Sequence, residues 1–201
     1  YERAVYAASL VKVQYNAETA ITDFDKNIQN AALLKGNDNY SRNEKDAWKN
    51  AEVKLEAEYT IPIETHNPME MHATTAMWEA DGKLTVYDKS QGPKGVQGEL
   101  TRMFGLEEKN VKVITEFVGG AFGNALRSWP HVYAAVIAAK KLNRPVKVLL
   151  NREQMFTMVG YRPQSWQKIG IGANKNGKLY GITHQAVSNT SNYEDFREAK
   201  I

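Results

Sequence analysis

The amino-acid sequence predicts an α+β fold with a mixed sheet, hairpins and two main helices. Apolar and polar residues alternate with a period of two in several short segments, and turn sequences rich in Gly and Asn separate some of them. Two other segments have apolar residues spaced three or four apart, as on one face of a helix. Hairpins combined with strand–helix alternation in the middle of the chain favour a mixed α+β domain.

The first 50 residues contain few predicted elements. Residues 4–10 resemble the end of a helix, and residues 11–15 alternate between apolar and polar, which predicts a short strand. Residues 27–50 are polar, with the turn-forming sequence G-N-D-N-Y-S at their centre. We therefore expect a domain boundary in this segment, with a short helix over residues 41–48.

Strand patterns dominate the rest of the chain. Residues 53–61 have the clearest alternation, which predicts an antiparallel or edge strand with one solvent-exposed face. Asp81-Gly82 predicts a hairpin between strands at 73–80 and 83–88. The other predicted strands are 111–117 and 145–150, and a further hairpin that joins 164–173 to 178–188 through a turn at 174–177.

Two helices are predicted between these strands. In the first, Val96, Leu100 and Phe104 recur every four residues, and Gly105 follows as a C-terminal cap. The second has stronger signals at both ends. They are Ser128 as a cap, Pro130 in the first turn, Val132, Val136 and Ala139 on one face, and Lys140, Lys141, Asn143 and Pro145 at the end.

Composition excludes several classes of protein. The 201 residues include 26 basic and 23 acidic side chains, four His and no Cys. Without Cys there is no disulfide scaffold, no Cys-ligated zinc or iron–sulfur cluster and no thiol nucleophile. A formal net charge of +3 gives no strong bias toward nucleic acid or acidic lipid. No apolar run approaches the roughly 20 residues that a membrane-spanning helix needs.

The most informative segment is F-V-G-G-A-F-G-N at residues 117–124, between a predicted strand and the second helix. Its three glycines let the backbone approach a ligand and present N–H groups to it. The segment matches neither a phosphate-binding Walker loop nor a dinucleotide fingerprint. The glycines alone leave ligand binding and a tight structural turn both open.

Two histidines and two glutamates occur between residues 64 and 72, which raises the question of a metal site. His66 and His72 are six residues apart, so they share no face of a regular helix, and Pro68 interrupts any strand between them. We therefore expect buried, hydrogen-bonded histidines rather than a metal site formed with Glu64 and Glu70.

A single residue and one short polar segment carry weaker signals. Gln91 lies where a predicted strand gives way to a turn, and ligand contacts concentrate in such loops. Asn151, Arg152 and Glu153 are most simply interpreted as solvated or locally paired surface residues.

These segments together resemble the molybdenum-binding subunit of the xanthine dehydrogenase and aldehyde oxidoreductase family, and most of all the bacterial three-subunit aldehyde oxidoreductases. The resemblance covers residues 50–195. It rests on motifs in the family's order and separations: H-N-P-M-E-M-H-A-T-T-A-M-W at 66–78, L-T-V-Y-D-K-S-Q-G at 84–92, F-V-G-G-A-F-G at 117–123, N-R-P-V-K-V-L-L-N-R-E-Q-M-F at 143–156 and G-Y-R-P at 160–163.

The resemblance implies a domain organisation. Residues 1–35 would be the tail of a preceding hammerhead-like α/β domain, and residues 36–50 a linker. Residues 51–201 would form the first molybdopterin-binding domain, truncated at its C-terminal side. The chain would then be a fragment of a larger subunit.

The resemblance also implies which residues contact the cofactor. Gln91 would lie beside the molybdenum and hydrogen-bond one of its oxo ligands. The loop would place its Phe and backbone N–H groups against the molybdenum end of the pterin through Gly119, Gly120, Ala121, Phe122 and Gly123. None of these residues would ligate the metal directly. The family's general-base glutamate is expected beyond Ile201, so no catalytic residue is expected in this fragment.

Three departures from the family pattern affect the prediction. Ala121 replaces the third glycine of the loop, and a methyl group there requires ordinary backbone angles. Asn124 and Ala125 stand where many members have Gly-Lys. Leu126 occupies the substrate-pocket position where purine-oxidising members have a glutamate, which favours an aldehyde substrate, with an aromatic heterocycle as the other option.

The implied reaction is hydroxylation with oxygen from water on a molybdenum–molybdopterin cofactor, expected in its cytosine dinucleotide form. Electrons would leave through iron–sulfur and flavin subunits or domains, and the other partners would be the rest of the subunit and a small aldehyde. No nucleic-acid or membrane partner is expected, and the compartment stays open. The 201 residues alone are expected to be inactive and without molybdenum. The alternative is a non-catalytic α+β ligand-binding or interaction module that keeps the family fold without its cofactor.

Overall fold

The computed structural model describes residues 1–33 and 46–191. These two ranges fall in separate compact units of the chain. None of the helices in them has both the length and the apolar composition that a membrane crossing requires. The predicted boundaries of the hammerhead-like tail, the linker and the molybdopterin-binding domain remain predictions.

The first unit contains short helices without buried residues. They are α1 (Glu2–Ser9), α2 (Phe24–Asn27) and the 3₁₀ helix η1 (Ile28–Asn30). The helix predicted at 4–10 is therefore confirmed, but the strand predicted at 11–15 is wrong. Residues 11–23 have no regular secondary structure, because none of the described residues supplies a neighbouring strand with which they could form hydrogen bonds.

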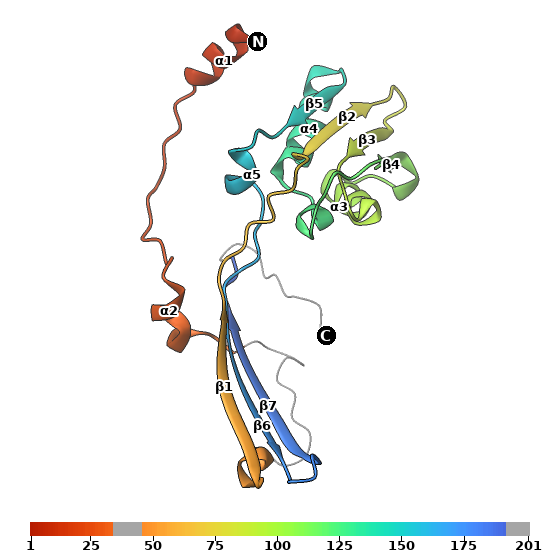
Figure 1. The fold of residues 1–201 in the computed structure, drawn as a ribbon. Helices are drawn as coiled ribbons and strands as arrows, with labels where there is room; N and C mark the ends of the chain where they lie inside the picture. The colour runs from red at the N-terminus through yellow and green to blue at the C-terminus, as the bar shows by residue number, and fades with distance from the viewer. Residues whose placement is uncertain (34–45, 192–201) are drawn as a thin grey trace. The chain divides into compact units, whose positions relative to one another are not determined.

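The second unit contains a four-stranded mixed sheet in the order β4-β3-β2-β5 (Figure 1). Its strands are β2 (Ala73–Trp78), β3 (Leu84–Asp88), β4 (Val111–Ile114) and β5 (Val146–Leu149). β3 and β4 are parallel, whereas β2 is antiparallel to both β3 and β5. The predicted hairpin at Asp81-Gly82 is confirmed, and the strands predicted at 111–117 and 145–150 are present with shorter bounds.

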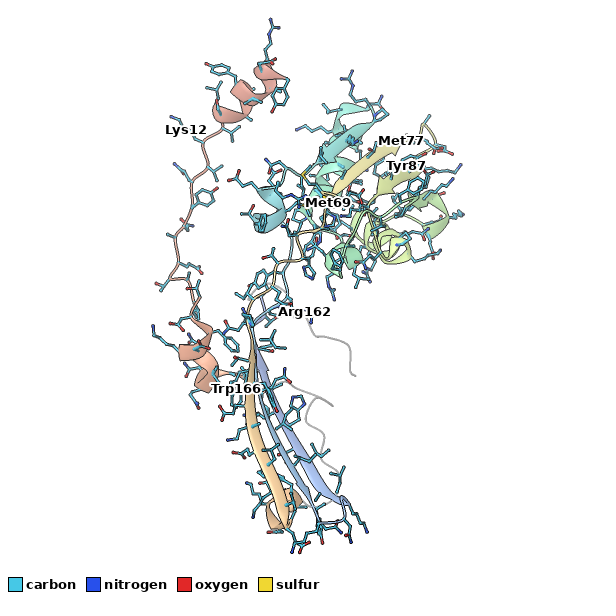
Figure 2. The ribbon with its side chains drawn as sticks, in the orientation of Figure 1. Lys12, Met69, Met77, Tyr87, Arg162 and Trp166 are labelled. Atoms are coloured by element: carbon cyan, nitrogen blue, oxygen red, sulfur yellow. The ribbon has the colours of Figure 1, made fainter. Side chains whose placement is uncertain are left out.

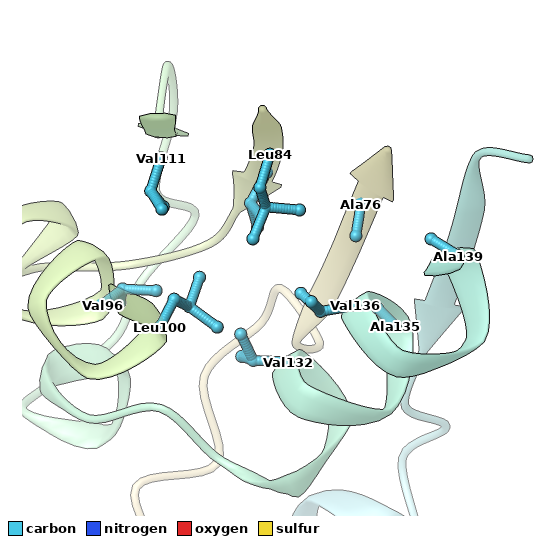
Figure 3. Close-up of a cluster of buried hydrophobic side chains, with 10 residues drawn as sticks. Ala76, Leu84, Val96, Leu100, Val111, Val132, Ala135, Val136 and Ala139 are labelled. Atoms are coloured by element: carbon cyan, nitrogen blue, oxygen red, sulfur yellow. The ribbon is translucent and has the colours of Figure 1, made fainter. Parts of the chain in front are cut away.

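Helices α3 (Pro93–Phe104) and α4 (Pro130–Leu142) pack against this sheet. Their apolar side chains point toward those of β2, β3 and β4 and form one buried cluster (Figure 3). The cluster consists of Ala76, Leu84, Val86, Val96, Leu100, Val111, Val132, Ala135, Val136 and Ala139. The two predicted helical faces are thus confirmed as the core of the layered region.

The helix ends follow the predicted stop signals, with one correction. Gly105 and Asn143 cap α3 and α4 in the left-handed conformation. Ser128 does not cap α4: the cap position is Trp129, with Pro130 in the first turn, and the Ser128 hydroxyl has no hydrogen-bond partner among the described residues. Ser128 lies one residue before the cap, because the chain is still extended at Trp129.

Short helical turns complete the layered region. They are the 3₁₀ helices η3 (Glu108–Asn110) and η4 (Asn124–Leu126) and the helix α5 (Gln154–Thr157). A further 3₁₀ helix, η2 (Ala47–Asn50), precedes β1. The short helix predicted over residues 41–48 lies mostly outside the described residues.

The second sheet is antiparallel and has the order β1-β6-β7. Its strands are β1 (Val53–Ile61), β6 (Ser165–Ala173) and β7 (Leu179–Ser188). Side chains project from both sides of these strands, Trp166 among them (Figure 2). The predicted hairpin between β6 and β7 and the antiparallel edge strand β1 are confirmed.

The two faces of this second sheet differ. Trp48 of η2 is buried against one face, where Gly170, Gly172 and Gly181 leave room for it. On the other face, Leu55 and Ile182 stand in one row across the sheet and are exposed. The prediction of a single solvent-exposed face on β1 is therefore wrong: every β1 residue except Ala57 is exposed, because none of the described residues forms a layer over the apolar side.

Candidate functional site

The candidate site lies where β3 and β4 end. Parallel strands direct their carboxyl ends to the same edge of a sheet, so the loop after β3 and the loop after β4 meet there. The first carries Gln91 and the second the glycine-rich segment 119–123. The backbone N–H of Gly123 donates to Oε1 of Gln91 at 3.1 Å, and the backbone N–H of Gln91 donates to the carbonyl of Ala125 at 2.8 Å. The structure thus brings together the two features that the sequence singled out.

The backbone of the loop is unusual at three positions. Gly120, Phe122 and Gly123 have φ angles of 87°, 56° and 96°, in the left-handed region that favours glycine. Phe122 adopts this conformation although it has a bulky side chain, and its ring is 71% exposed. Such strain at an exposed aromatic residue is typical of a ligand-binding segment.

Ala121 fits the loop without strain. Its φ lies outside the left-handed region, and its methyl group is buried. Replacing the family's third glycine with alanine is therefore compatible with this backbone.

Hydrogen bonds hold the backbone N–H groups at both ends of the loop but not those in its middle, where, among the described residues, only the Ala121 carbonyl is paired, with the N–H of Asn124. The N–H of Gly119 donates to Oε2 of Glu70 at 2.5 Å, and that of Gly123 donates to Gln91. Within the described part of the chain, the N–H groups of Gly120, Ala121 and Phe122 have no acceptor. Three consecutive N–H groups next to Gly123, the residue that contacts Gln91, thus have no acceptor among these residues.

The start of the loop is held by Glu70. In addition to the side-chain contact, the Glu70 N–H donates to the Gly119 carbonyl at 3.1 Å. The amine of Lys89 donates to the Glu70 carbonyl at 2.5 Å and lies 3.9 Å from its carboxylate. Burial lowers the pKa of Lys89, with a smaller opposing effect from Glu70. This buried lysine ties the loop after β3 to the segment that carries Glu70.

Arg152 holds the segment before Glu70. Its guanidinium donates to Oδ1 of Asn67 at 2.7 Å, to the carbonyl of Pro68 at 2.8 Å and to that of Met69 at 2.8 Å. The expectation that Arg152 is a solvated or locally paired surface residue is therefore wrong. Its partners lie more than 80 residues away, and no local pattern in the sequence indicates them.

The end of the loop is held by Asn124, which the sequence marked only as a departure from the family pattern. Asn124 is buried, and its Oδ1 is paired with Nε2 of His72. Its Nδ2 donates to the Gly160 carbonyl at 2.9 Å and lies 3.4 Å from Nδ1 of His66. Nε1 of Trp129 donates to the Asn124 carbonyl at 2.6 Å. One amide thus connects segments distant in sequence beneath the loop.

Both histidines have hydrogen-bond partners, as predicted, but only His72 is buried. His72 is buried, and this burial lowers its pKa, whereas the bond to Asn124 opposes the shift. His66 is half-buried. In residues 1–33 and 46–191, no group of three or more His, Asp or Glu side chains is arranged to hold a metal ion.

A second group of buried polar side chains lies at the end of β3. Asp88 accepts a hydrogen bond from Thr74 Oγ1 at 2.5 Å, and burial raises its pKa. His131 is buried beside it, with 3.9 Å between its Nε2 and Oδ1 of Asp88. Burial and the neighbouring His72 lower the pKa of His131 to about 4. His131 is therefore neutral at physiological pH.

Leu126 lies in η4, directly after the loop, and its side chain is 58% exposed. Exposed apolar side chains thus flank the available backbone donors: Phe122 within the loop and Leu126 after it. No charged group occupies the Leu126 position, as the sequence indicates.

Comparison with known proteins identifies the family. The model of the molybdopterin cofactor-binding domain matches residues 24–201. The aldehyde oxidoreductase molybdenum-binding subunit PaoC of Escherichia coli (strain K12) is 32% identical over 191 residues, which cover 94% of this chain and 26% of that protein. Indole-3-acetaldehyde oxidase of Arabidopsis thaliana is 33% identical over 133 residues, covering 66% of this chain and 10% of that protein. The chain thus spans about a quarter or less of the length of these relatives.

Solved structures share the fold. Quinoline 2-oxidoreductase from Pseudomonas putida 86 aligns with a TM-score of 0.73 and 20% identity, covering 91% of this chain and 25% of that one. Aldehyde oxidoreductase from Desulfovibrio gigas aligns with a TM-score of 0.65 and 23% identity, covering 71% of this chain and 16% of that one. The predicted fold class and family resemblance are both confirmed, and the chain belongs to the molybdopterin cofactor-binding family of the aldehyde oxidoreductases and their relatives.

Proposed function

We propose that this chain is part of the large subunit of a molybdenum hydroxylase and that it contributes contacts to the molybdopterin cofactor. The observation that carries the proposal is the run of backbone N–H groups at Gly120, Ala121 and Phe122, which have no acceptor among the described residues and lie in the loop that contacts Gln91. Successive donors in a segment with left-handed residues are typical of an anion-binding loop.

The donor set fits the expected cofactor. A molybdenum–pterin group carries anionic sulfur and oxygen atoms, which uncharged N–H donors bind without adding a competing positive charge. Oε1 of Gln91 already accepts the N–H of Gly123, so the Gln91 amino group is the part of its amide left to donate. Gln91 would orient an oxygen atom of the bound group, and residues 119–123 would hold its molybdenum end. Residues of this chain would not ligate the metal.

When bound, the cofactor supplies the two-electron oxidation of the substrate carbon with oxygen derived from water. The chain's own residues bind and orient that group. Glu70 and Asn124 hold the two ends of the loop in place, and the buried Lys89 and Arg152 hold the segment that carries Glu70. A loop held at both ends needs little reorganisation on binding.

We propose an aldehyde as the substrate, with an aromatic heterocycle as the other option. Phe122 and Leu126 present apolar surface beside the available donors, and no carboxylate stands at position 126 to pair with a polar purine edge. The general-base glutamate would lie beyond Ile201. We also propose that the cofactor is in its cytosine dinucleotide form and that iron–sulfur and flavin subunits or domains are the partners. The absence of Cys from these 201 residues agrees with clusters carried elsewhere.

The test uses the full-length subunit produced with its iron–sulfur and flavin partners. Bound molybdenum and pterin are quantified, and oxidation of aromatic aldehydes is followed with an artificial electron acceptor. We expect near-stoichiometric cofactor and turnover, and an approximately 100-fold lower kcat for Gln91→Ala with a much smaller loss of folding stability. Gln185→Ala, on the exposed surface of β7, is the matched control.

Absence of pterin from the full-length protein would instead support a non-catalytic ligand-binding or interaction module. The 201 residues alone are expected to hold no molybdenum and to show no turnover, and near-stoichiometric metal in them would contradict this expectation.

A further inference from the structure

His66 lies beside the glycine-rich loop but has no role in the mechanism proposed above. Its Nε2 is 3.7 Å from the position that a β-carbon on Gly123 would occupy. Gly123 is also the residue whose N–H is held by Gln91. The imidazole of His66 and the amide of Gln91 therefore both lie next to the same residue of the loop.

The contact with the Gly160 carbonyl fixes the orientation of the Asn124 side-chain amide, and therefore which of its atoms faces His66. Its Nδ2 lies 2.9 Å from the Gly160 carbonyl, and because a carbonyl only accepts, this atom must be the amino group. Its Oδ1 is correspondingly paired with Nε2 of His72, which can donate. The second hydrogen of the Asn124 amino group is then directed to Nδ1 of His66, 3.4 Å away.

This pairing determines the tautomer of His66. Nδ1 must accept from Asn124, so the neutral imidazole carries its proton on Nε2. Nε2 has no hydrogen-bond partner within residues 1–33 and 46–191. An uncharged N–H donor therefore lies beside Gly123, next to the amide of Gln91 and the free backbone donors of the loop.

We propose that His66 is a second side-chain donor to the anionic molybdenum end of the cofactor, and that Asn124 is a positioning residue that fixes its tautomer. This inference rests on the proposed function. It adds a contact from the segment before β2, whereas the other contacts come from the loops after β3 and β4. The donor chemistry matches that of Gln91 and the backbone N–H groups: each is neutral and each offers hydrogen to an anion.

The experiment uses the full-length subunit with its partner subunits and the variants His66→Ala, His66→Gln and Asn124→Asp. The amide of a glutamine at position 66 offers a donor in place of Nε2, so His66→Gln tests rescue. Asn124→Asp keeps the acceptor for His72 but removes the hydrogens directed to His66 and to the Gly160 carbonyl, so its unfolding temperature is compared with that of the wild type. His184→Ala, an exposed histidine on β7, is the matched control. The readouts are pterin retained after dialysis, the electron paramagnetic resonance signal of Mo(V), and the unfolding temperature.

We expect His66→Ala to lose pterin about tenfold faster than the wild type, and His66→Gln to restore most of the retention. Asn124→Asp should shift the Mo(V) signal in the same direction as His66→Ala, whereas His184→Ala should behave as the wild type. Pterin held equally well by the wild type and His66→Ala would overturn the inference alone. So would equal loss in His66→Ala and His66→Gln. A wild-type protein without pterin would overturn the proposed function, and this inference with it.

Discussion

The two sheets of the molecule differ in how far their apolar side chains are buried. Helices α3 and α4 cover the mixed sheet, and their shared cluster of small and branched side chains is buried. The three-stranded sheet buries Trp48 against glycines on one face, and its other face exposes residues such as Leu55 and Ile182. The site residues belong to the covered sheet, where a packed core holds the loops after β3 and β4 in place. The site thus lies beside the most buried region of the molecule.

The largest expected effect contrasts a leucine in a helix that covers the mixed sheet with a leucine on the three-stranded sheet. Leu100 is fully buried in α3, so Leu100→Ala should lower the free energy of unfolding by about 3–4 kcal/mol through lost contacts and a cavity. Leu55 on β1 is 60% exposed, so Leu55→Ala should cost less than about 1 kcal/mol. Urea unfolding of the two variants measures both values. Equal losses would break the comparison and show that another layer covers β1 in the protein tested.

The sequence predicted the covered sheet well because its signals are local. Apolar spacing and caps indicate α3 and α4, and alternation with Asp81-Gly82 indicates the β2–β3 hairpin. Gln91 and the glycines also stand out locally, since each lies just after a strand. Their proximity follows from the parallel pairing of β3 and β4, which no local pattern in the sequence indicates.

Other features depend on distant partners and could not be predicted from local patterns. Asn124 joins His72 and Gly160, which lie 52 and 36 residues away, and Arg152 joins a segment more than 80 residues away. The alternation in 53–61 predicts a strand but says nothing of what covers its apolar side. The same alternation at 11–15 forms no strand, because pairing needs a neighbour that the local sequence does not contain.

The second prediction compares a buried and an exposed histidine through the pH dependence of the free energy of unfolding. The pKa of His131 is lowered from about 6.5 to about 4, so below pH 6.5 the unfolded chain binds a proton that the folded chain does not. Stability should therefore fall as the pH drops from 6.5 to 4, by about 3 kcal/mol from His131 alone. The lowered pKa of His72 adds to this loss, whereas the raised pKa of Asp88 offsets part of it near the acidic end.

His131→Leu is the corresponding variant, because the two ring nitrogens form no hydrogen bond among the described residues and leucine keeps the site filled. Urea unfolding at pH 7, 6 and 5 should show a flatter dependence than in the wild type. His184→Leu, on the exposed three-stranded sheet, should leave the slope unchanged. A wild-type slope in His131→Leu would mean that other groups cause the acid sensitivity.

The smallest expected effect is the change in stability when one of two glycines is replaced by alanine, and its sign should differ between Gly172 on the three-stranded sheet and Gly98 in α3. A β-carbon on Gly172 would lie 2.3 Å from the Trp48 carbonyl oxygen and 2.7 Å from the β-carbon of Ala51, so the backbone of η2 would have to move. Gly172→Ala should therefore destabilise the protein by about 1–3 kcal/mol. Gly98 in α3 has no atom within 4 Å of the equivalent position, and Gly98→Ala should stabilise by about 0.5–1 kcal/mol through helix propensity. Denaturation midpoints measure both changes, and a neutral Gly172→Ala would show that Trp48 does not pack on this sheet, leaving both of its faces exposed.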